Sequence, residues 1–347
     1  MGRAAAKYLA MIDIDGAHGE GGGAILRQAL GMAVYSGQPI RVFNIRAGRE
    51  RPGLAPQHLK AVEAVGAVCG AQVRGANPWS TEINFAPGPL RSGTWDFDIG
   101  TAGSTTLLLQ TVLLPCLCHP GEYEFRLIGG SDVPWSPPAD YLNWVTFQAL
   151  RSFGAAALSV RRRGYYPKGG GRLLTRLACS GGGEVPLELV EAGEVKAIRG
   201  VSHAAMVLKD RRVAERGADA ADHLLTRLGY PVQIDVTYSN SVSPGSGVTL
   251  WTESDDGLPL GGSALGAPGK PADEVGREAA RELMGAMEAD AAVDRYLADQ
   301  LIPFLAVRGG RMKTSEITAH VRSNIYVAEK ILSASFEIEG TTVRSMR

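Results

Sequence analysis

The chain has 347 residues, and its 36 basic and 36 acidic side chains give a formal net charge of zero. Proteins that coat long nucleic acids are normally basic, so this balance implies no broad basic face. A nucleic-acid substrate of any kind would be bound only at an end. The length allows a sizeable core and two domains. Four cysteines favour a reducing compartment over a disulfide framework. With no membrane-spanning apolar run and no recognisable signal peptide, we expect a soluble, cytoplasmic protein.

A glycine-rich segment begins the first stretch of regular pattern. Residues 16–23 contain five glycines and a single carboxylate, Glu20. Apolar residues then recur at helical spacing from Ile25 to Ala33, with Arg27 near the start. Free backbone N–H groups at a helix N-terminus can bind anions, but these glycines match neither the dinucleotide fingerprint nor the phosphate loop. The pattern alone leaves a phosphate site and a merely tight turn as equal alternatives.

A strand and a basic loop follow this helix. Residues 40–43 have the pattern of a strand. Arg46 and Arg49 come next, in a loop that leads to a second helix at Gln57. Arginines at a strand end can make bidentate contacts with phosphate oxygens. The spacing of Arg27, Arg46 and Arg49 therefore predicts that the three side chains can converge on one anion.

The order helix, strand, helix recurs twice along the chain. The second copy follows a strand at 95–99 and a glycine turn, and the third lies near the C-terminus. Their elements are expected at 105–117, at 123–127 and from Asp140 in the second copy, and at 295–307, 312–317 and 321–332 in the third. Three such units predict pseudo-equivalent modules around a centre, forming a closed α+β domain instead of an open array.

A different pattern interrupts the chain between the second and third copies. We expect a small α/β domain at 185–285, inserted into a large domain made of 1–184 and 286–347. Its strands are expected at 194–203, 232–238 and 248–252, its helices at 210–228 and 274–287, and a loop at 261–270. Just before the insert, a glycine-rich segment carries basic residues that could guide RNA. They are Arg161, Arg162, Arg163 and Lys168.

Two sequence motifs in the first unit identify a family resemblance. The segment from Glu20 reads EGGGAILR, and the segment from Ile45 reads IRAGRERPGLAPQHL. Together they closely resemble the RNA 3′-terminal phosphate cyclase family, whose signature pairs EGGG-x-ILR with IRAGR-x-x-PGL-x-x-QHL. Ala24 departs from the glutamine that the family often has there. The resemblance covers essentially the whole chain beyond the first ten residues and is weakest inside the insert.

The resemblance implies both a fold and an activity. The fold is a large domain of three repeated units, each similar to the C-terminal domain of translation initiation factor 3, interrupted by a smaller domain. The activity is the ATP-dependent conversion of an RNA 3′-terminal phosphate to a 2′,3′-cyclic phosphate. It passes through a covalent histidine–AMP intermediate and an RNA(3′)pp(5′)A intermediate. The implied partners are therefore RNA 3′-phosphate ends, ATP and a divalent metal, Mg or Mn.

His320 lies between the third predicted strand and its helix. A histidine at such a junction usually caps or packs, but Gln57 and Asp140 occupy the corresponding places in the other copies, which favours a functional role. In the resembling family this position, within an H-x-x-[ST]-N motif, is the nucleophile that takes AMP from ATP. Neutral imidazole can attack phosphorus and leave a reactive phosphoramidate. Transferred AMP then provides the leaving group that lets the ribose 2′-OH close the ring.

The resemblance also implies the residues that bind ATP and metal. By their pattern alone, residues 296–300 form an ordinary amphipathic helix; in the family, the matching YLADQ segment holds the nucleotide. The implied nucleotide-binding residues are Gln57, Gln110, Pro134, Tyr296, Leu297, Ala298, Asp299 and Gln300. Trp135 adds a face for stacking, and Glu20 is the best candidate to hold the divalent cation against the triphosphate. Cys116 to His119 looks metal-like but ends an apolar helix, which favours core cysteines.

Two other classes of protein are alternatives to a cyclase. One is a non-catalytic ribosome-biogenesis relative of the same fold, against which His320 and the YLADQ segment argue. The other is an enolpyruvyl transferase-type enzyme, which also repeats α+β units around phosphate-binding arginines. That enzyme needs neither ATP nor a histidine nucleophile, so nucleotide binding separates the two.

Overall fold

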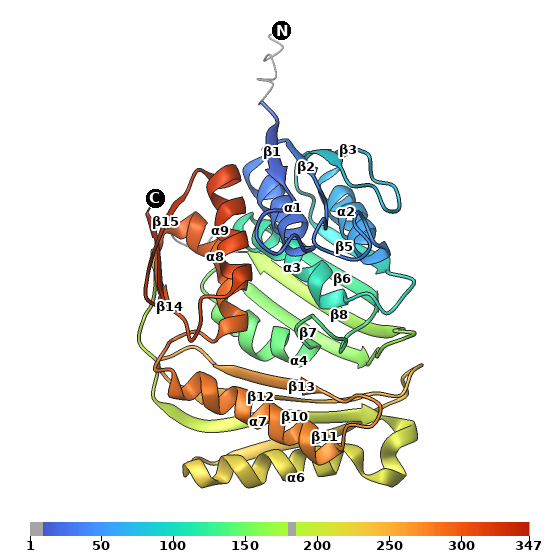
Figure 1. The fold of residues 1–347 in the computed structure, drawn as a ribbon, viewed down its shortest axis with the longest axis vertical. Coiled ribbons are helices and arrows are strands. Elements are labelled where there is room, and N and C mark those ends of the chain that lie inside the picture. The colour runs from blue at the N-terminus through green and yellow to red at the C-terminus, as the bar shows by residue number, and fades with distance from the viewer. Residues whose placement is uncertain (1–9, 180–184, 347) are drawn as a thin grey trace.

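The computed structural model describes residues 10–179 and 185–346, which form a larger body above a smaller one in Figure 1. Three units make up the larger body, and each has the chain order strand, helix, strand, helix, strand, strand. The first unit comprises β1 (Ile12–Asp15), α1 (Ala24–Ser36), β2 (Ile40–Phe43), α2 (Pro56–Cys69), β3 (Gln72–Arg74) and β4 (Ile83–Ala86).

The second unit contains an irregular second helix. It comprises β5 (Gly93–Asp98), α3 (Thr105–Cys118), β6 (Gly121–Gly129), α4 (Ala139–Tyr141), the π-helical η1 (Leu142–Thr146), α5 (Phe147–Ala149), β7 (Ala155–Arg162) and β8 (Gly171–Cys179). The third unit comprises β9 (Leu187–Leu189), α8 (Arg295–Arg308), β14 (Gly310–Lys313), α9 (Ala319–Leu332), β15 (Ser335–Glu339) and β16 (Thr342–Met346).

The sheets of the three units share one topology. Their strand orders are β1-β2-β4-β3, β5-β6-β8-β7 and β9-β14-β16-β15. In each sheet the first two strands pair in parallel and the other two pairs are antiparallel. The predicted α+β fold with repeated units is therefore confirmed, and each repeat also contains strands outside the helix–strand–helix pattern.

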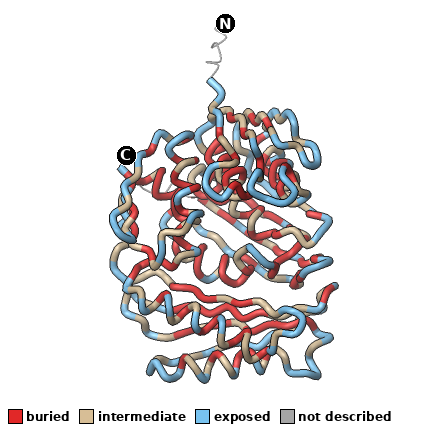
Figure 2. The backbone as a smooth tube through the Cα atoms, viewed as in Figure 1, coloured by how far each residue is buried: buried red, intermediate tan, exposed pale blue. Residues whose placement is uncertain are grey.

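The first helix of the second unit lies at the centre of the larger body. Helix α3 is apolar around its circumference, and most of its side chains are buried. It packs against α1 and against strands of its own sheet, which is where an all-round apolar helix belongs. Ser104 begins it by accepting a hydrogen bond from the Leu107 N–H. Figure 2 shows buried segments running through the helices inside the larger body.

The smaller body interrupts the third unit between β9 and α8. It comprises β10 (Val195–Ala205), the 3₁₀ helix η2 (Met206–Arg211), α6 (Val213–Leu225), the 3₁₀ helix η3 (Thr226–Leu228), β11 (Val232–Ser239), β12 (Ser246–Ser254), β13 (Gly261–Leu265) and α7 (Ala272–Glu288). Its sheet has the order β11-β10-β12-β13. Ile198, Leu250 and Leu283 belong to a core separate from that of the larger body. Because β9 pairs with β14, we propose that the insert begins after Leu189 and not at residue 185.

Some predicted elements differ from the structure. The segment 261–270 was expected to be a loop but contains β13. Its glycines allow close packing, since a Cβ on Gly261 would lie 2.4 Å from the Tyr141 ring and one on Gly262 would lie 2.5 Å from the Leu283 nitrogen. The third-copy strand expected at 312–317 ends at Lys313. Among the described residues, no helix is both long and apolar enough to cross a membrane.

Candidate functional site

In each unit, the start of the second helix contacts the start of the next unit's first helix. Three contacts of this kind close a ring among the described residues. They are the Ser104 N–H to Gln57 Oε1 hydrogen bond of 3.3 Å, the Tyr141 Oη to Asp294 Oδ1 hydrogen bond of 2.7 Å, and the 3.4 Å approach of His320 Nε2 to Glu20 Oε2. The residues at the three predicted corresponding positions, Gln57, Asp140 and His320, are each the second residue of a helix. The repeat therefore brings His320 to the first unit's glycine loop.

His320 is accessible at this junction. Thr318 caps helix α9, because its hydroxyl accepts a hydrogen bond from the Val321 N–H. His320 therefore lies in the first turn of the helix. The side chains of His320 and Glu20 are 42% and 38% exposed, which leaves room for a substrate. Burial is the main cause that lowers the pKa of His320, Glu20 opposes it, and the nearby Arg27 and Arg49 add to the lowering. The imidazole is therefore mainly neutral at neutral pH.

The glycine loop is packed tightly between neighbouring segments. Gly21 has a φ of 56°, and a Cβ there would lie 2.7 Å from the Gly48 nitrogen. A Cβ on Gly23 would lie 2.1 Å from His58 Nε2, and one on Gly19 would lie 2.7 Å from Ser323 Oγ. Close approach of backbone and side chains thus explains the glycine content sterically, and it seats Glu20 beside α2 and α9.

Three arginines surround His58, a residue not singled out among the predicted site residues. His58 is 4% exposed, and its pKa is lowered to about 3 by burial and then by Arg27, Arg46 and Arg49. A Cβ on Gly23 would lie 3.1 Å from Arg27 Nη1, and one on Gly22 would lie 2.9 Å from Arg49 Nη2, so both arginines approach the glycine loop beside His58. The adjacent Gln57, in the QHL motif, was the available sequence signal for this position.

The three arginines differ in their surroundings. The Arg46 Nη1 donates to the carbonyl oxygens of Arg51 and Gly53 at 2.9 and 2.8 Å, so this side chain also braces its own loop. Arg49 is 49% exposed, and its Nη2 lies 3.9 Å from the Glu20 carboxylate. Arg27 is half-buried, and burial lowers its pKa to about 10. Arg49 is consequently the most available of the three for a ligand.

Asp299 places a carboxyl group beside Arg27. It is half-buried in α8, and burial raises its pKa to about 7, with Arg27 opposing the rise and Asp294 and Glu20 adding to it. The Asn324 amide donates to the Asp299 carbonyl at 2.8 Å. This bond ties α8 to α9, the helix that carries His320.

The rest of the YLADQ segment is largely engaged within the protein. Leu297 and Ala298 are fully buried, so only their backbone or packing could serve a ligand. The Gln300 amide is hydrogen-bonded at both ends. Tyr296 is 42% exposed, and the Arg295 guanidinium lies 4.8 Å from its ring centroid. Tyr296 therefore offers one free ring face at most.

The other predicted nucleotide-binding residues occupy separate places. Gln110 lines a small cavity with Gln28 and Gln300, where α1, α3 and α8 meet. The side-chain oxygen of Gln57 accepts a hydrogen bond from the Ser104 N–H. Pro134 is exposed in the loop between β6 and α4. The geometry of the chain alone does not gather these residues around His320.

The surroundings of Glu20 suit a cation that is shared with a bound ligand. In the described residues, only Asp132, Asp140 and His203 form a group of three potential metal ligands, so Glu20 stands outside any protein-only cluster. Magnesium commonly binds through one or two carboxylates together with substrate phosphates. A lone, exposed carboxylate beside arginines fits that mode. Cys116, in contrast, is buried in the core, as its apolar helix indicated.

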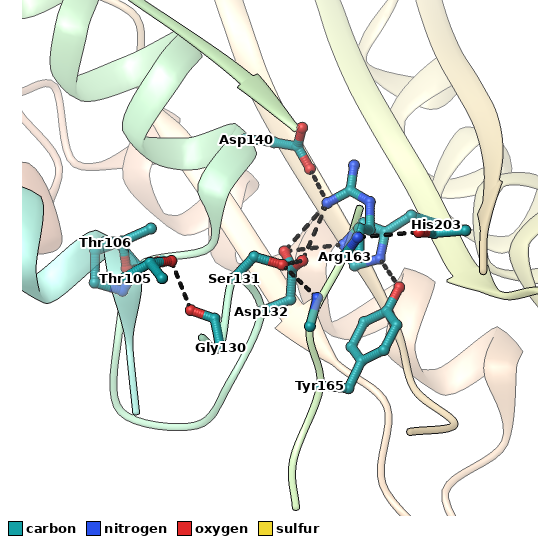
Figure 3. A network of polar contacts seen from close by, with 12 residues as sticks. Thr105, Thr106, Gly130, Ser131, Asp132, Asp140, Arg163, Tyr165 and His203 are labelled. Atoms are coloured by element: carbon teal, nitrogen blue, oxygen red, sulfur yellow. Dashed lines mark hydrogen bonds and ion pairs between the residues drawn. The ribbon is translucent and has the colours of Figure 1, made fainter. Parts of the chain in front are cut away.

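A second polar cluster joins the two bodies (Figure 3). The Arg163 Nη1 lies 2.7 Å from an Asp140 oxygen and 3.2 Å from an Asp132 oxygen. His203 of β10 approaches Asp132 at 3.4 Å and shares a 2.8 Å hydrogen bond with the Tyr165 hydroxyl. Although burial acts to lower the pKa of Arg163, the two carboxylates raise it, while burial and Arg163 lower the pKa of His203.

The structure changes the roles expected for two arginines of the basic segment. Arg163 is 6% exposed, so the prediction that it helps to guide RNA is wrong. Arg162 donates to the Gly170 carbonyl at 2.8 Å, whereas Arg161 and Lys168 remain exposed. The Arg163 guanidinium is paired with the carboxylates of both Asp132 and Asp140, so a cationic group already occupies the space between them.

Comparison with known proteins agrees with the motifs. The family model described as RNA 3′-terminal phosphate cyclase matches residues 18–338. Relatives of that name include proteins from Pyrococcus furiosus, 45% identical over 95% of this chain and 96% of the relative, and Thermococcus kodakarensis, 46% identical over 95% of each. A third, from Methanopyrus kandleri, is 45% identical over 96% of each.

Proposed function

Because the chain belongs to the RNA 3′-terminal phosphate cyclase family of enzymes, we propose that it uses ATP to convert an RNA 3′-terminal phosphate to a 2′,3′-cyclic phosphate. The observation that carries this proposal is the accessible His320 imidazole, 3.4 Å from Glu20 and close to Arg27 and Arg49. A neutral imidazole in a positive environment is suited to attack on a phosphate ester.

In the first step, a His320 nitrogen attacks the α-phosphorus of ATP. The new N–P bond replaces the bond to pyrophosphate, which leaves, and AMP stays on the histidine. Arg27, Arg46 and Arg49 bind phosphate oxygens and stabilise the charge that develops on the leaving group. A divalent cation, Mg or Mn, would be held by Glu20 and would neutralise triphosphate charge when bound.

In the second and third steps, AMP activates the RNA end. A terminal phosphate oxygen of RNA attacks the AMP phosphorus, which frees His320 and forms RNA(3′)pp(5′)A. The ribose 2′-OH then attacks the activated terminal phosphate, AMP leaves, and the cyclic ester closes. This last step is intramolecular and gains from proximity. Arg49, the most exposed of the three arginines, supplies positive charge that offsets the negative charge of the two adjacent phosphates.

The nucleotide is proposed to lie along α8. Tyr296 would stack against adenine with its free face, and Asp299 and Gln300 would lie near the ribose and base. Gln110, Gln57 and the exposed Pro134 complete the proposed set, while the buried Leu297 and Ala298 would shape the pocket from beneath. The raised pKa of Asp299, about 7, means that a bound hydroxyl could meet a proton donor or an acceptor there.

Covalent labelling tests the proposal. Incubation with ATP and magnesium or manganese should add one AMP by intact mass, and the bond should break in acid but survive alkali. His320→Ala and His320→Asn should both abolish the adduct and cyclisation while ATP binding persists. His223→Ala, at an exposed histidine of α6, is the matched control and should label normally.

Three other outcomes would contradict the proposal. AMP mapped to a lysine, such as Lys313 or Lys168, would indicate a ligase-like enzyme. An unlabelled protein that still binds RNA would indicate a non-catalytic ribosome-biogenesis relative. An unlabelled protein that transfers an enolpyruvyl group would indicate the third class, which needs neither ATP nor a histidine nucleophile.

A further inference from the structure

Two adjacent tyrosines between β7 and β8 have opposite surroundings. Tyr165 is 3% exposed and holds His203 through its hydroxyl, whereas Tyr166 is 70% exposed. The loop backbone is held on both sides, since the Gly169 N–H donates to the Tyr165 carbonyl at 2.8 Å and the Lys168 N–H donates to Ser243 Oγ at 3.1 Å. The side chains of Tyr166 and Lys168 extend from this fixed backbone into solvent.

This loop adjoins the His320 site through one intervening segment. A Cβ on Gly169 would lie 2.7 Å from the Thr101 carbonyl oxygen, and one on Gly103 would lie 2.8 Å from the Gln57 Cβ. The Gln57 side chain also accepts a hydrogen bond from the neighbouring Ser104 N–H. Gln57 precedes His58, the residue whose pKa is lowered by Arg27, Arg46 and Arg49. The Tyr166 loop is therefore linked to the arginine site by direct packing through residues 101–103 and Gln57.

We infer that Tyr166 and Lys168 bind the RNA nucleotides that precede the terminal phosphate, Tyr166 by stacking on a base and Lys168 by contacting a backbone phosphate. This inference rests on the proposed function. An exposed aromatic ring beside a cation is the usual combination for single-stranded nucleic acid, and it tolerates any base sequence. The fixed backbone reduces the ordering cost of binding.

A short strand gripped by few side chains also agrees with the charge of the chain. The formal net charge is zero, so affinity cannot come from a broad positive surface. Arg163, the most central arginine of the basic segment, is committed to the buried cluster with Asp132 and Asp140. Lys168 is thereby left as an exposed cation on the loop itself.

Binding of a 3′-phosphorylated single-stranded decamer, measured by fluorescence anisotropy, tests the inference. Tyr166→Ala should raise Kd about 5- to 50-fold, and Tyr166→Phe, which retains a stacking ring, should bind like the wild type. Lys168→Ala should reduce the slope of log K against log salt by about 0.7, the value for one phosphate of a single strand. The matched control is Lys330→Ala, an exposed lysine at the far end of α9, which should leave both quantities unchanged.

AMP-adduct formation from ATP alone separates this inference from the proposed function. The Tyr166 and Lys168 variants should label with AMP at the wild-type rate, because neither side chain contacts the His320 site. Their melting temperatures should also match, since both side chains are exposed. If Tyr166→Ala binds the decamer within twofold of wild type, the inference is wrong even though labelling succeeds. If the wild type binds RNA through Tyr166 but never labels, the proposed function fails and the RNA surface remains.

Discussion

The Nε2 atom of His320 lies 3.4 Å from the Oε2 atom of Glu20, which joins the third unit of the larger body to the first. The two corresponding junctions are made by hydrogen bonds that hold helix starts, Gln57 to Ser104 and Tyr141 to Asp294. Two of the three junctions are thus hydrogen bonds between helix starts, and the third is an accessible imidazole–carboxylate pair. The junction with the accessible imidazole is also the one that closes the ring of units.

The ionisation of His320 should follow its surroundings. Its pKa is lowered by burial and by Arg27 and Arg49, with Glu20 opposing, so NMR titration of the free protein should give a midpoint below about 6.5, the ordinary histidine value. Glu20→Gln removes the opposing charge and should lower the midpoint further. A lowered midpoint would keep the His320 imidazole neutral over more of the acidic range than an ordinary histidine. A midpoint above 6.5 in the wild type would contradict the assigned environment.

Replacing Arg49 should affect turnover alone, whereas replacing Arg46 should also lower the free energy of unfolding. Arg49→Ala removes an exposed side chain, so its melting temperature should barely move, while transition-state stabilisation for 3′-phosphate ends falls by about 2–4 kcal/mol. Arg46→Ala also leaves the carbonyls of Arg51 and Gly53 without their donor, which should reduce the free energy of unfolding by about 1–2 kcal/mol. Unchanged turnover in Arg49→Ala would refute its role on phosphate.

Asp299 should make stability depend on pH. Its folded pKa of about 7 exceeds the ordinary unfolded value of about 3.9, so the folded state keeps a proton that the unfolded state loses. The free energy of unfolding should therefore fall as pH rises from about 4 to 7.

Asp299→Asn should flatten this fall by about 1–3 kcal/mol, a range that allows for solvent screening of a half-buried side chain. Urea unfolding at a series of pH values measures the slope. Asp219→Asn, at an exposed position on α6, should keep the wild-type slope. A parallel fall in wild type and Asp299→Asn would locate the pH dependence elsewhere.

The buried cluster should hold the two bodies together. Arg163→Ala leaves the buried carboxylates of Asp132 and Asp140 without their cation, which should cost about 3–5 kcal/mol of unfolding free energy. Arg161→Ala, at an exposed site in the same basic segment, should change stability by less than about 0.5 kcal/mol. Equal melting temperatures for the two variants would show that the cluster does not stabilise the joint.

Local residue patterns were enough to predict most of the elements and the family. The glycine turn that ends at Ser104 and the long apolar run after it predicted the helix at 105–117, which the structure shows as α3 (Thr105–Cys118). The repeated order of elements also predicted three units and an interruption between the second and third. The paired motifs beginning at Glu20 and Ile45 predicted the cyclase family, which the family model confirms.

Which side chains meet depends on how the units pack against one another. Arg163 has the same sequence character as Arg161, yet one is 6% exposed in a cluster with Asp132 and Asp140 while the other is at the surface. His58 is surrounded by arginines from two different elements. Strand β13 forms where its glycines allow the larger body and α7 to approach. Such contacts join residues far apart in the chain, and their energies depend on packing and burial, which no local pattern of residues encodes.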